Sequence, residues 1–492
     1  MTDSAVPAVR LRVLNEAPLR AEGKYVLYWM TAFRRLHANF GLDRAVELAR
    51  ELKKPLVILE ALRVKYRWAS DRIHRFVIDG MADHAERAEA LAERGVVYYP
   101  YVEPQPDAGS GLLESLADDA CAVIGDDFPC FFLPRMLAAV APRLKVRFEV
   151  VDSNGLYPLR ATDRVFTMAF HFRRFLQKEL RPFLEEDQFP QADPLKSLHL
   201  PPLKLPRETL KKWPLADCAA LRADGGLADL PIDHDVTIAP IAGGPHAAAK
   251  TLRKFLAQNV ARYGEGRNNP DDDCASGLSP YLHFGHISTH EIFRTATAEH
   301  PWSPEKVATK VTGKAEGWWG LPKSLESFLD ELITWREIGY NFCAHRDDYD
   351  EYDSLPEWCR KTFEKHATDK RPQLYSLKEL ERAETYDPLW NAAQRQLTRD
   401  GKIHNYLRML WGKKVIEWSE TPQQALKTLV QLNNKYALDG RNPNSYSGIF
   451  WCFGRYDRPW SERSIFGQIR YMSSDNTAKK LDVKKYLRKY GE

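Results

Sequence analysis

The chain of 492 residues lacks the features of a membrane or secreted protein. No apolar stretch reaches the ~18 residues that cross a bilayer. The stretch from Met1 to Leu19 has no positively charged start followed by an apolar core, so we predict no signal peptide. We therefore expect no membrane contact and a cytoplasmic location.

Cysteine and nucleotide-binding motifs are also scarce. Seven scattered cysteines, with no CxxC pair, argue against a disulfide framework and against a zinc or iron–sulfur site. No GxGxxG follows the first apolar run, and no GxxxxGK[ST] occurs. An ordinary dinucleotide site or P-loop is therefore unsupported, and we predict no metal site.

The chain also lacks a large excess of charge of one sign, because it has 71 basic and 67 acidic residues. Bulk electrostatics thus require no polyanionic partner. The exception is the stretch 453–492, with ten Lys or Arg against five Asp or Glu. Such a patch suits a phosphate-bearing ligand or nucleic acid, although a solvated charged tail has the same composition.

The first third of the chain alternates short apolar runs with amphipathic segments. The runs predict buried strands at Tyr25–Met30, Leu56–Leu62, Val96–Val102, Ala122–Gly125 and Val146–Val151. The segments between them predict helices near Asp43–Leu52, Ser70–Arg94 and Leu133–Val140. This alternation is typical of a doubly wound α/β domain, a parallel sheet with helices on both faces.

Composition divides the chain into three parts. Residues 1–180 carry the α/β pattern, and residues 181–246 hold ten of the 31 prolines, which predicts a long interdomain linker. Helical periodicity dominates residues 247–492, so we predict an all-α second domain. After Asp439 the pattern becomes irregular and aromatic, which indicates a functional loop.

A small polar run precedes one predicted helix, after Tyr263. Ser276, Gly277, Leu278 and Ser279 lead into Pro280, with Ser279 expected as N-cap and Pro280 as the first helical residue. Backbone N–H groups and hydroxyls in this arrangement can bind phosphate oxygens. A capped helix without a ligand has the same sequence.

Glu331 and Trp335 are four residues apart on a predicted helix and share one face. A carboxylate beside an indole could hydrogen-bond to, and stack on, a planar heterocycle. The alternative is a surface glutamate next to a core tryptophan.

Thirteen tryptophans are many for this length. Trp411 and Trp418 are seven residues apart on one predicted helix, so they lie on one stripe about 10 Å apart. Two indoles at that spacing could pass an electron in steps, whereas an aromatic stripe can also be plain core.

The segment Asp439–Trp460 alternates polar turn formers with tryptophan and arginine. Exposed aromatics interleaved with cations suit an extruded base and its phosphates. A structural loop is the alternative.

Taken together, these segments resemble the photolyase/cryptochrome superfamily, and within it the class II cyclobutane pyrimidine dimer photolyases in their bacterial form. The resemblance runs from Tyr25 to about Met472. Its most specific pieces are SGLSPYLHFGHIS (Ser276–Ser288), ELITWRE (Glu331–Glu337), LWNAAQ (Leu389–Gln394), HNYLRMLWGKKVIEW (His404–Trp418) and DGRNPNSYSGIFWCFGRYDRPW (Asp439–Trp460).

The resemblance implies an antenna-like α/β domain, a linker and a helical domain that binds FAD. By resemblance, Tyr263 and Ser276–Ser279 would hold the FAD phosphates, Arg408 and Asp439 would pair beside the flavin ring, and Asn433 would face flavin N5. The remaining walls would come from Trp335, Arg336, Asn405 and Gly440.

The resemblance also implies light-driven repair of ultraviolet-damaged DNA. Reduced FAD would give one electron to a flipped pyrimidine dimer, which splits and returns it. Glu331 would hydrogen-bond a pyrimidine carbonyl, and Met409 would pack on the cyclobutane. The DNA and lesion contacts would further include Trp335, Trp451, Arg441 and Arg458, and the electron-transfer residues would be Trp411, Trp390 and Trp418.

Ala38 departs from the family pattern, because an Asp is expected there. An antenna chromophore of the 8-hydroxy-5-deazaflavin type is therefore an open expectation. The segment Trp302–Leu325 looks like an insert, and we expect a surface lid or a contact at the DNA edge.

Two other functions stay open. One is a cryptochrome-like blue-light sensor that binds FAD without repair, and the other is a helical DNA-binding protein that has lost the flavin. Retention of Glu331, Met409, Trp335 and Trp451 favours repair over sensing. We expect a monomer that works on the bacterial nucleoid.

Overall fold

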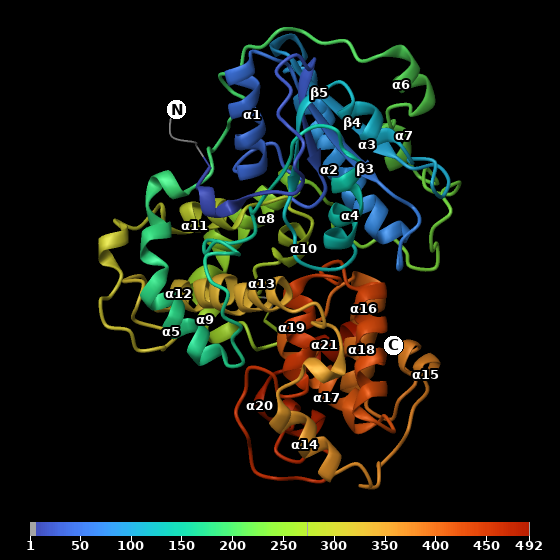
Figure 1. The fold of residues 1–492 in the computed structure, drawn as a ribbon. Helices are drawn as coiled ribbons and strands as arrows, with labels where there is room; N and C mark the ends of the chain where they lie inside the picture. Colours follow the sequence, from blue (N-terminus) through green and yellow to red (C-terminus); the bar gives the residue numbers. More distant parts are fainter. Residues whose placement is uncertain (1–5, 273, 492) are drawn as a thin grey trace. The chain divides into compact units, whose positions relative to one another are not determined.

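The computed structural model describes residues 6–272 and 274–491 and divides into two compact units (Figure 1). Neither unit is continuous in sequence. Unit 1 comprises Met1–Thr162, Arg181–Arg253 and Leu278–Pro304. Unit 2 comprises Asp163–Leu180, Lys254–Gly277 and Glu305–Glu492.

A six-stranded sheet forms the centre of unit 1. Its strands are β1 (Leu11–Val13), β2 (Tyr25–Met30), β3 (Leu56–Leu62), β4 (Val96–Val102), β5 (Ala120–Asp126) and β6 (Phe148–Val151). The order is β1-β6-β5-β2-β3-β4, and all neighbours are parallel except β1 and β6.

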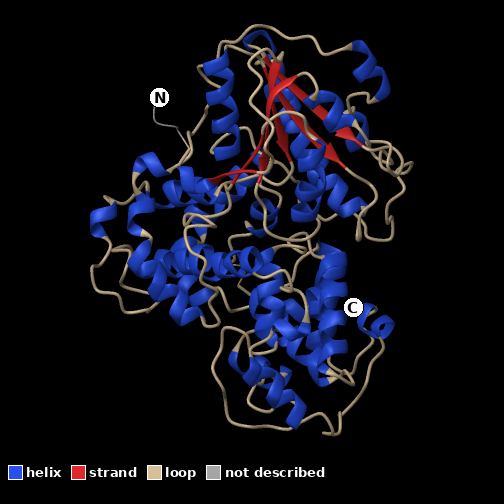
Figure 2. Cartoon of the chain, viewed as in Figure 1, coloured by secondary structure: helices blue, strands red, loops and turns tan. Residues whose placement is uncertain are grey.

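Helices cover both faces of this sheet (Figure 2). Tyr28 and Met30 of β2 pack on one face, with α1 (Phe40–Leu52) and α2 (Asp71–Glu89). Leu27 of β2 packs on the other, with α3 (Leu112–Ala117) and α4 (Leu133–Val140). Successive side chains of a strand point to opposite faces, so a doubly buried strand must be apolar throughout.

The five predicted strands and the parallel sheet are confirmed. The sequence did not predict β1 or α3. Each is short, with three and six residues, and gives too few periods for a pattern to emerge. β1 forms because its backbone pairs with the edge of β6.

The proline-rich stretch lies within unit 1 and is not structureless. It contains α6 (Arg207–Lys212) and α7 (Cys218–Arg222). Its backbone bonds to the α/β core at several points: Leu200 N donates to Arg94 O, and Ala216 N to Pro100 O. The stretch is therefore a strap on the α/β unit.

Two helices after the strap, α10 (Ser279–His283) and α11 (Thr289–Thr297), also belong to unit 1. The predicted boundary at residue 247 assigns them to the helical domain instead. The turn between them lies tightly on the loop after β2, where a Cβ on Gly285 would come 2.1 Å from Ala32 O. Arg35 Nη1 also donates to Gly285 O (3.0 Å).

Unit 2 is built from helices (Figure 1). Helix α8 (Pro245–Gln258) begins in unit 1 and ends in unit 2. The others in unit 2 are α5 (Ala169–Glu179), α9 (Tyr263–Gly266), α12 (Lys323–Leu329), the π-helical turn η8 (Asp330–Trp335), α13 (Arg336–His345), α14 (Glu357–Lys365), α15 (Leu377–Glu381), α16 (Pro388–Asp400), α17 (Asn405–Glu417), α18 (Pro422–Tyr436), α19 (Pro443–Cys452), α20 (Ser474–Lys480) and α21 (Lys484–Tyr490).

Helix α5 precedes the strap in sequence but packs in unit 2, so the predicted boundary at residue 180 separates it from its partners. Within unit 2, Arg173 of α5 forms a long-range ion pair with Asp330. In the described part of the chain, no helix is both long and apolar enough to span a bilayer.

Candidate functional site

Glu331 lies in a π-helical turn within an otherwise continuous helical run. The turn, η8, joins α12 to α13 and carries both Glu331 and Trp335. A π-turn inserts one extra residue per turn and is frequent at functional sites. Arg173 of α5 holds the start of the turn, because its Nε and Nη2 donate to the two carboxylate oxygens of Asp330 (2.7 and 2.8 Å).

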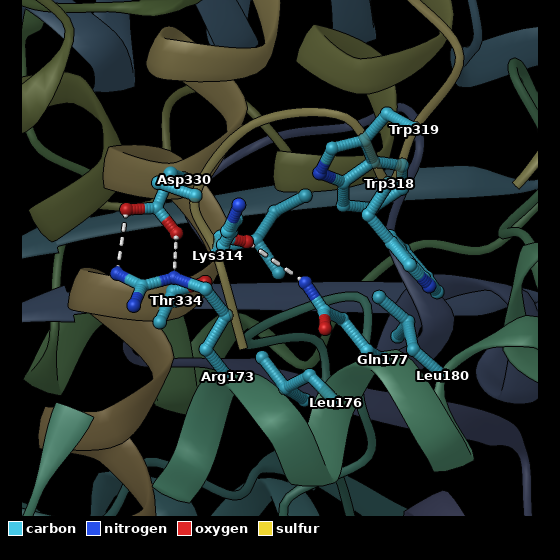
Figure 3. Close-up of a pocket in the computed structure, with 11 residues that line it drawn as sticks. Arg173, Leu176, Gln177, Leu180, Lys314, Trp318, Trp319, Asp330 and Thr334 are labelled. Carbon is cyan, nitrogen blue, oxygen red and sulfur yellow. Dashed lines mark hydrogen bonds and ion pairs between the residues drawn. The ribbon is translucent and has the colours of Figure 1, made fainter. Parts of the chain in front are cut away.

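A pocket beside this ion pair is closed by the segment Trp302–Leu325, which looked like an insert in the sequence (Figure 3). Gln177 of α5 binds it through the Lys314 carbonyl (2.9 Å) and the N–H groups of Thr312 and Gly313. Trp318 and Trp319 line the pocket and are 4% and 6% exposed. Both indoles are therefore packing residues, and the expected surface lid or DNA-edge contact does not describe them.

Glu331 forms an ion pair with Arg267, which the sequence did not suggest. The Arg267 guanidinium also lies 5.7 Å from the ring centre of Tyr263. Desolvation raises the pKa of the Glu331 carboxyl, the nearby Asp330 charge raises it further, and Arg267 acts in the opposite direction. The net upward shift favours a protonated carboxyl that can donate a hydrogen bond.

Arg267 has unused binding capacity. Its Nε is buried and has no hydrogen-bond acceptor in the part of the chain that the structure describes. An unsatisfied charged donor between Tyr263 and Glu331 suits an anionic or carbonyl oxygen of a bound molecule.

Arg408 and Asp439 meet as expected. Arg408 Nη2 lies 3.1 Å from Asp439 Oδ1, and both side chains are partly exposed, at 22% and 13%. Arg408 comes from α17, and Asp439 follows α18. A half-buried ion pair at the end of a helix can face a polar heterocycle while its charges stay compensated.

Asn433 lies directly behind this region, 1% exposed, with its amide donating to Ser445 Oγ (2.6 Å). Gly440 turns beneath the end of α18, where a Cβ would come 2.9 Å from Asn433 O. Any side chain at residue 440 would thus push the backbone away from Asn433.

Arg441 was predicted to contact DNA, and the structure gives it another role. Its side chain is 2% exposed, and its guanidinium donates to the carbonyls of Asn434, Ala437 and Leu438. These carbonyls end α18, where a buried cation satisfies unpaired acceptors. Arg441 therefore holds the turn and does not reach a surface.

Trp390 joins the two tryptophans that the sequence placed on one stripe. Its ring stacks on Trp411 at 6.5 Å and 8°, and meets Trp418 edge-on at 5.5 Å. All three are at most 1% exposed. Helix α17 ends at Glu417, so Trp418 lies just beyond it. An electron that moves between Trp411 and Trp418 would therefore pass through Trp390 of α16, and not directly along one helix face.

Trp418 also contacts Tyr375 and Tyr386, at 5.3 and 5.5 Å between ring centres. Tyr386 is 59% exposed. The aromatic row therefore extends from the buried Trp411 to the surface of unit 2.

Trp451 lies among cations. Lys413 Nζ is 5.0 Å from its ring centre and Arg470 Cζ is 5.6 Å away. Arg470 also lies over Trp460 (4.3 Å), as does Arg458 (5.3 Å). Trp460 is 37% exposed, and Arg458 is exposed as well.

The segment Asp439–Trp460 is only partly the irregular loop that we expected. Asn442 caps α19, its side chain accepting from Asn444 N, and Pro443 is the first helical residue. Tyr446 and Phe450 are buried, at 3% and 1%. The polar residues that suggested a loop are the start of a helix.

The capping of α10 also differs from the prediction. Leu278 is its N-cap, Ser279 is the first helical residue and Pro280 the second, with no side-chain cap. The chain passes from unit 2 to unit 1 between Gly277 and Leu278.

The other predicted site residues lie at different depths. Gly277 and Ser279 are exposed, Ser276 is half-buried and Leu278 is buried. Among the predicted wall and lesion contacts, Trp335 and Met409 are half-buried and Asn405 is exposed. Arg336 is buried, with its guanidinium over the Tyr340 ring.

The loop after β2, where an antenna chromophore was an open expectation, is held by hydrogen bonds to the last residue of β5. The N–H groups of Thr31, Ala32 and Phe33 all donate to Asp126 Oδ2 (2.7–2.9 Å). Ala38 is buried at 5% and has no polar side-chain atom. Ala38 therefore offers no side-chain polar group to a chromophore, and the antenna expectation stays a prediction.

Sequence reasoning missed Arg267, Lys413, Arg470 and Trp460. Trp460 ends one quoted motif and Lys413 lies within another, so both positions carried a usable signal. Arg267 and Arg470 lie outside the quoted motifs, and only folding brings them to Glu331 and Trp451.

Relatives of this chain share nearly its whole length, although no family model matches it. The deoxyribodipyrimidine photo-lyase of Methanothermobacter thermautotrophicus is 33% identical over 483 residues, 98% of each chain. That of Arabidopsis thaliana is 32% identical, covering 97% of this chain and 92% of its own.

Solved structures show the same fold. A class III photolyase from Agrobacterium tumefaciens has a TM-score of 0.64 at 19% identity, covering 95% of this chain and 86% of its own. A Synechocystis cryptochrome has a TM-score of 0.67 at 14% identity, with 95% and 88% covered.

Proposed function

Because this chain belongs to the photolyase/cryptochrome family, as a deoxyribodipyrimidine photo-lyase, we propose that it splits cyclobutane pyrimidine dimers in ultraviolet-damaged DNA with FAD. We further propose the class II assignment and blue or near-ultraviolet excitation. The observation that carries the proposal is the close-packed row Trp411, Trp390 and Trp418, whose first member lies on α17, the helix that also supplies Arg408.

When bound, reduced FAD would supply the excited electron for cleavage and take it back afterwards. The residues of unit 2 fit such a group. Arg408 with Asp439 offers compensated charge and Asn433 a buried amide, and Gly440 would form the wall next to them, in the turn that packs against Asn433. Tyr263, Ser276 and Gly277 of the same unit would hold the phosphates, and Trp335, Arg336 and Asn405 would complete the walls.

Glu331 would act on the lesion. Its protonated carboxyl donates to a pyrimidine carbonyl oxygen, where negative charge develops. Arg267 forms an ion pair with that carboxyl, so lesion binding would exchange one partner for the other. Trp335 and Trp451 would stack on the dimer, and Met409 would pack on the cyclobutane ring.

The flipped dimer leaves a gap in the duplex, and Arg458 would reach into it. Arg458 and Trp460 are exposed and lie 5.3 Å apart, from guanidinium carbon to ring centre. A cation stacked on an indole can replace lost base stacking.

The tryptophan row would carry electrons that reduce oxidised FAD. Trp411 would be the proximal donor, and the exposed Tyr386 marks where solvent reductant could act. Edge and face contacts of 5.5–6.5 Å between ring centres give short steps.

A blue-light sensor is the second candidate, because a cryptochrome shares the fold. Light-dependent loss of dimers from irradiated DNA, together with a flavin spectrum of the pure protein, would support repair over sensing. A flavin spectrum without dimer loss would support sensing, and no flavin at all would contradict both. We expect the active form to be a monomer in the cytoplasm.

Glu331→Gln tests the lesion chemistry. Gln fills the same space but cannot share a proton, so we expect repair quantum yield to fall by a factor equivalent to about 1–2 kcal/mol. FAD content and DNA affinity should stay unchanged.

The pH dependence sharpens this test. The raised pKa of Glu331 keeps it protonated at low pH, so the parent's yield should fall as pH rises through that pKa. Glu331→Gln should lack this fall. Equal yields for parent and variant, at matched flavin content, would remove Glu331 from the mechanism.

A further inference from the structure

Lys413 is a buried ammonium that the mechanism above does not use. It is 1% exposed on α17, one turn beyond Met409. Its Nζ donates to the Cys452 carbonyl (2.6 Å), which is its one hydrogen-bond partner within the described residues. A buried charge is costly unless paired, and an apolar residue of similar size is usually tolerated better. The position of Lys413 therefore calls for a reason.

The ammonium sits where α19 ends. Cys452 is the last residue of α19 and Trp451 the one before it. Terminal carbonyls of a helix lack backbone donors and carry partial negative charge, which a cation stabilises. Gly412 permits the approach, since a Cβ there would come 2.5 Å from Cys452 Sγ. Lys413 thus fixes the helix end that carries Trp451.

The same ammonium also faces the ring, 5.0 Å from its centre, and Arg470 faces it at 5.6 Å. Resting on the proposed role of Trp451 in stacking on the lesion, we propose that Lys413 is a positioning residue that holds the Trp451 ring in its stacking geometry. It acts through two contacts, the carbonyl of Cys452 and the face of the indole.

The charge of Lys413 can be titrated. Burial lowers the pKa of its ammonium to about 8. The groups facing it are Cys452 of α19, Cys359 of α14, and Asp457 and Arg470 of the segment after α19. Burial raises the pKa of Cys452 to about 11 and that of Cys359 to about 12, so both thiols stay neutral where Lys413 titrates.

The test measures the dissociation constant for a single strand with one pyrimidine dimer, and for its undamaged twin. Between about pH 7 and about pH 9, the parent should lose about threefold to tenfold in affinity for the damaged strand, as the cation–ring contact weakens. Lys413→Met should show the parent's high-pH affinity throughout, without this pH dependence. Affinity for the undamaged strand and FAD content should not change.

Two further variants make the result specific. Lys414→Met removes the next lysine, whose Nζ lies over Trp418 and not over Trp451, and should leave the parent's affinity and pH profile intact. In a Trp451→Ala background, Lys413→Met should have no further effect. Thermal unfolding of Lys413→Met checks that it folds, as expected when a buried charge becomes apolar.

Each outcome decides the matter. If Lys413→Met binds the damaged strand like the parent at neutral pH, or keeps its pH dependence, the positioning role is wrong. If the parent itself does not prefer the damaged strand, the proposed function fails and not this inference alone.

Discussion

The tryptophans of unit 2 form two groups with opposite surroundings. Trp390 contacts both Trp411 and Trp418. The indole N–H groups of Trp390 and Trp411 donate to neutral acceptors, Trp411 O (3.0 Å) and Gln394 Oε1 (2.9 Å) respectively. Trp451 and Trp460 instead contact cations.

One cation also approaches the first group, because Lys414 Nζ lies 5.4 Å from the Trp418 ring centre. Its charge is compensated by Glu417, 2.7 Å away. In the second group, Arg470 lies 3.5 Å from the Asp457 carboxylate. Among the residues that the structure describes, the one hydrogen bond of the Lys413 ammonium goes to a carbonyl.

Positive charge over an indole disfavours removal of an electron from the ring, and the same charge attracts phosphates nearby. Neutral, stacked indoles have no such penalty. The same residue type can therefore carry electrons in one group and bind a lesion in the other. Surroundings, which composition does not reveal, separate the two roles.

Loss of Trp390 should have the largest effect. Trp390→Phe, like Trp411→Phe, should stop photoreduction of oxidised FAD, since Trp390 joins Trp411 to Trp418. Repair should persist once the flavin is reduced chemically. Rates of flavin bleaching under blue light with reductant measure this.

The control is Trp29→Phe in unit 1, a buried indole outside the row, which should photoreduce like the parent. Trp418→Phe should slow the photoreduction of FAD less than Trp390→Phe does, because a shortened row still separates charge briefly. Photoreduction of Trp390→Phe at the parental rate would make the three indoles plain core and break the comparison.

Trp451→Ala should have the converse effect. We expect it to weaken binding to dimer-containing DNA by about 1–3 kcal/mol, the range for stacking on a base. Photoreduction should be unchanged, because the row does not include Trp451. Titrations and bleaching on the same sample test both halves, and slower photoreduction would show that the two groups are not separate.

Arg458→Ala should have the smallest effect, confined to duplex. We expect binding to damaged duplex to weaken by about 1 kcal/mol more than binding to damaged single strand, a part of the few kcal/mol that flipping costs. A single strand has no gap to fill. Titrations on both substrates at two salt concentrations measure the difference.

Lys485→Ala is the matched control, since Lys485 is exposed on α21. It should weaken damaged and undamaged DNA alike and lower the salt dependence slightly, as a phosphate contact does. An equal loss on duplex and single strand for Arg458→Ala would make Arg458 another such contact.

Much of unit 1 was predictable because its strands are local. Tyr25–Met30, Leu56–Leu62 and Val96–Val102 coincide with β2, β3 and β4, since a fully buried strand must be apolar at each residue. The division into units was not predictable in the same way. Gly285 packs against Ala32, and Arg173 pairs with Asp330, across more than a hundred residues of sequence.

The candidate site was predictable only as separate pieces. Motif resemblance named Arg408 and Asp439, which do meet, and Trp390, whose place between Trp411 and Trp418 no periodicity could give. It also named Arg441 as a DNA contact, because a charged residue in a polar run has no sequence mark that tells a buried cap from an exposed side chain.

The sequence by itself determined which residues are apolar, where helices and strands can form, and which motifs are present, because these depend on neighbours along the chain. Only the tertiary structure decided what each motif faces. Arg267 reaches Glu331 and Lys413 reaches Trp451 through contacts between helices distant in sequence. Burial and neighbouring charge, which set the protonation of Glu331 and Lys413, exist only once those helices have packed.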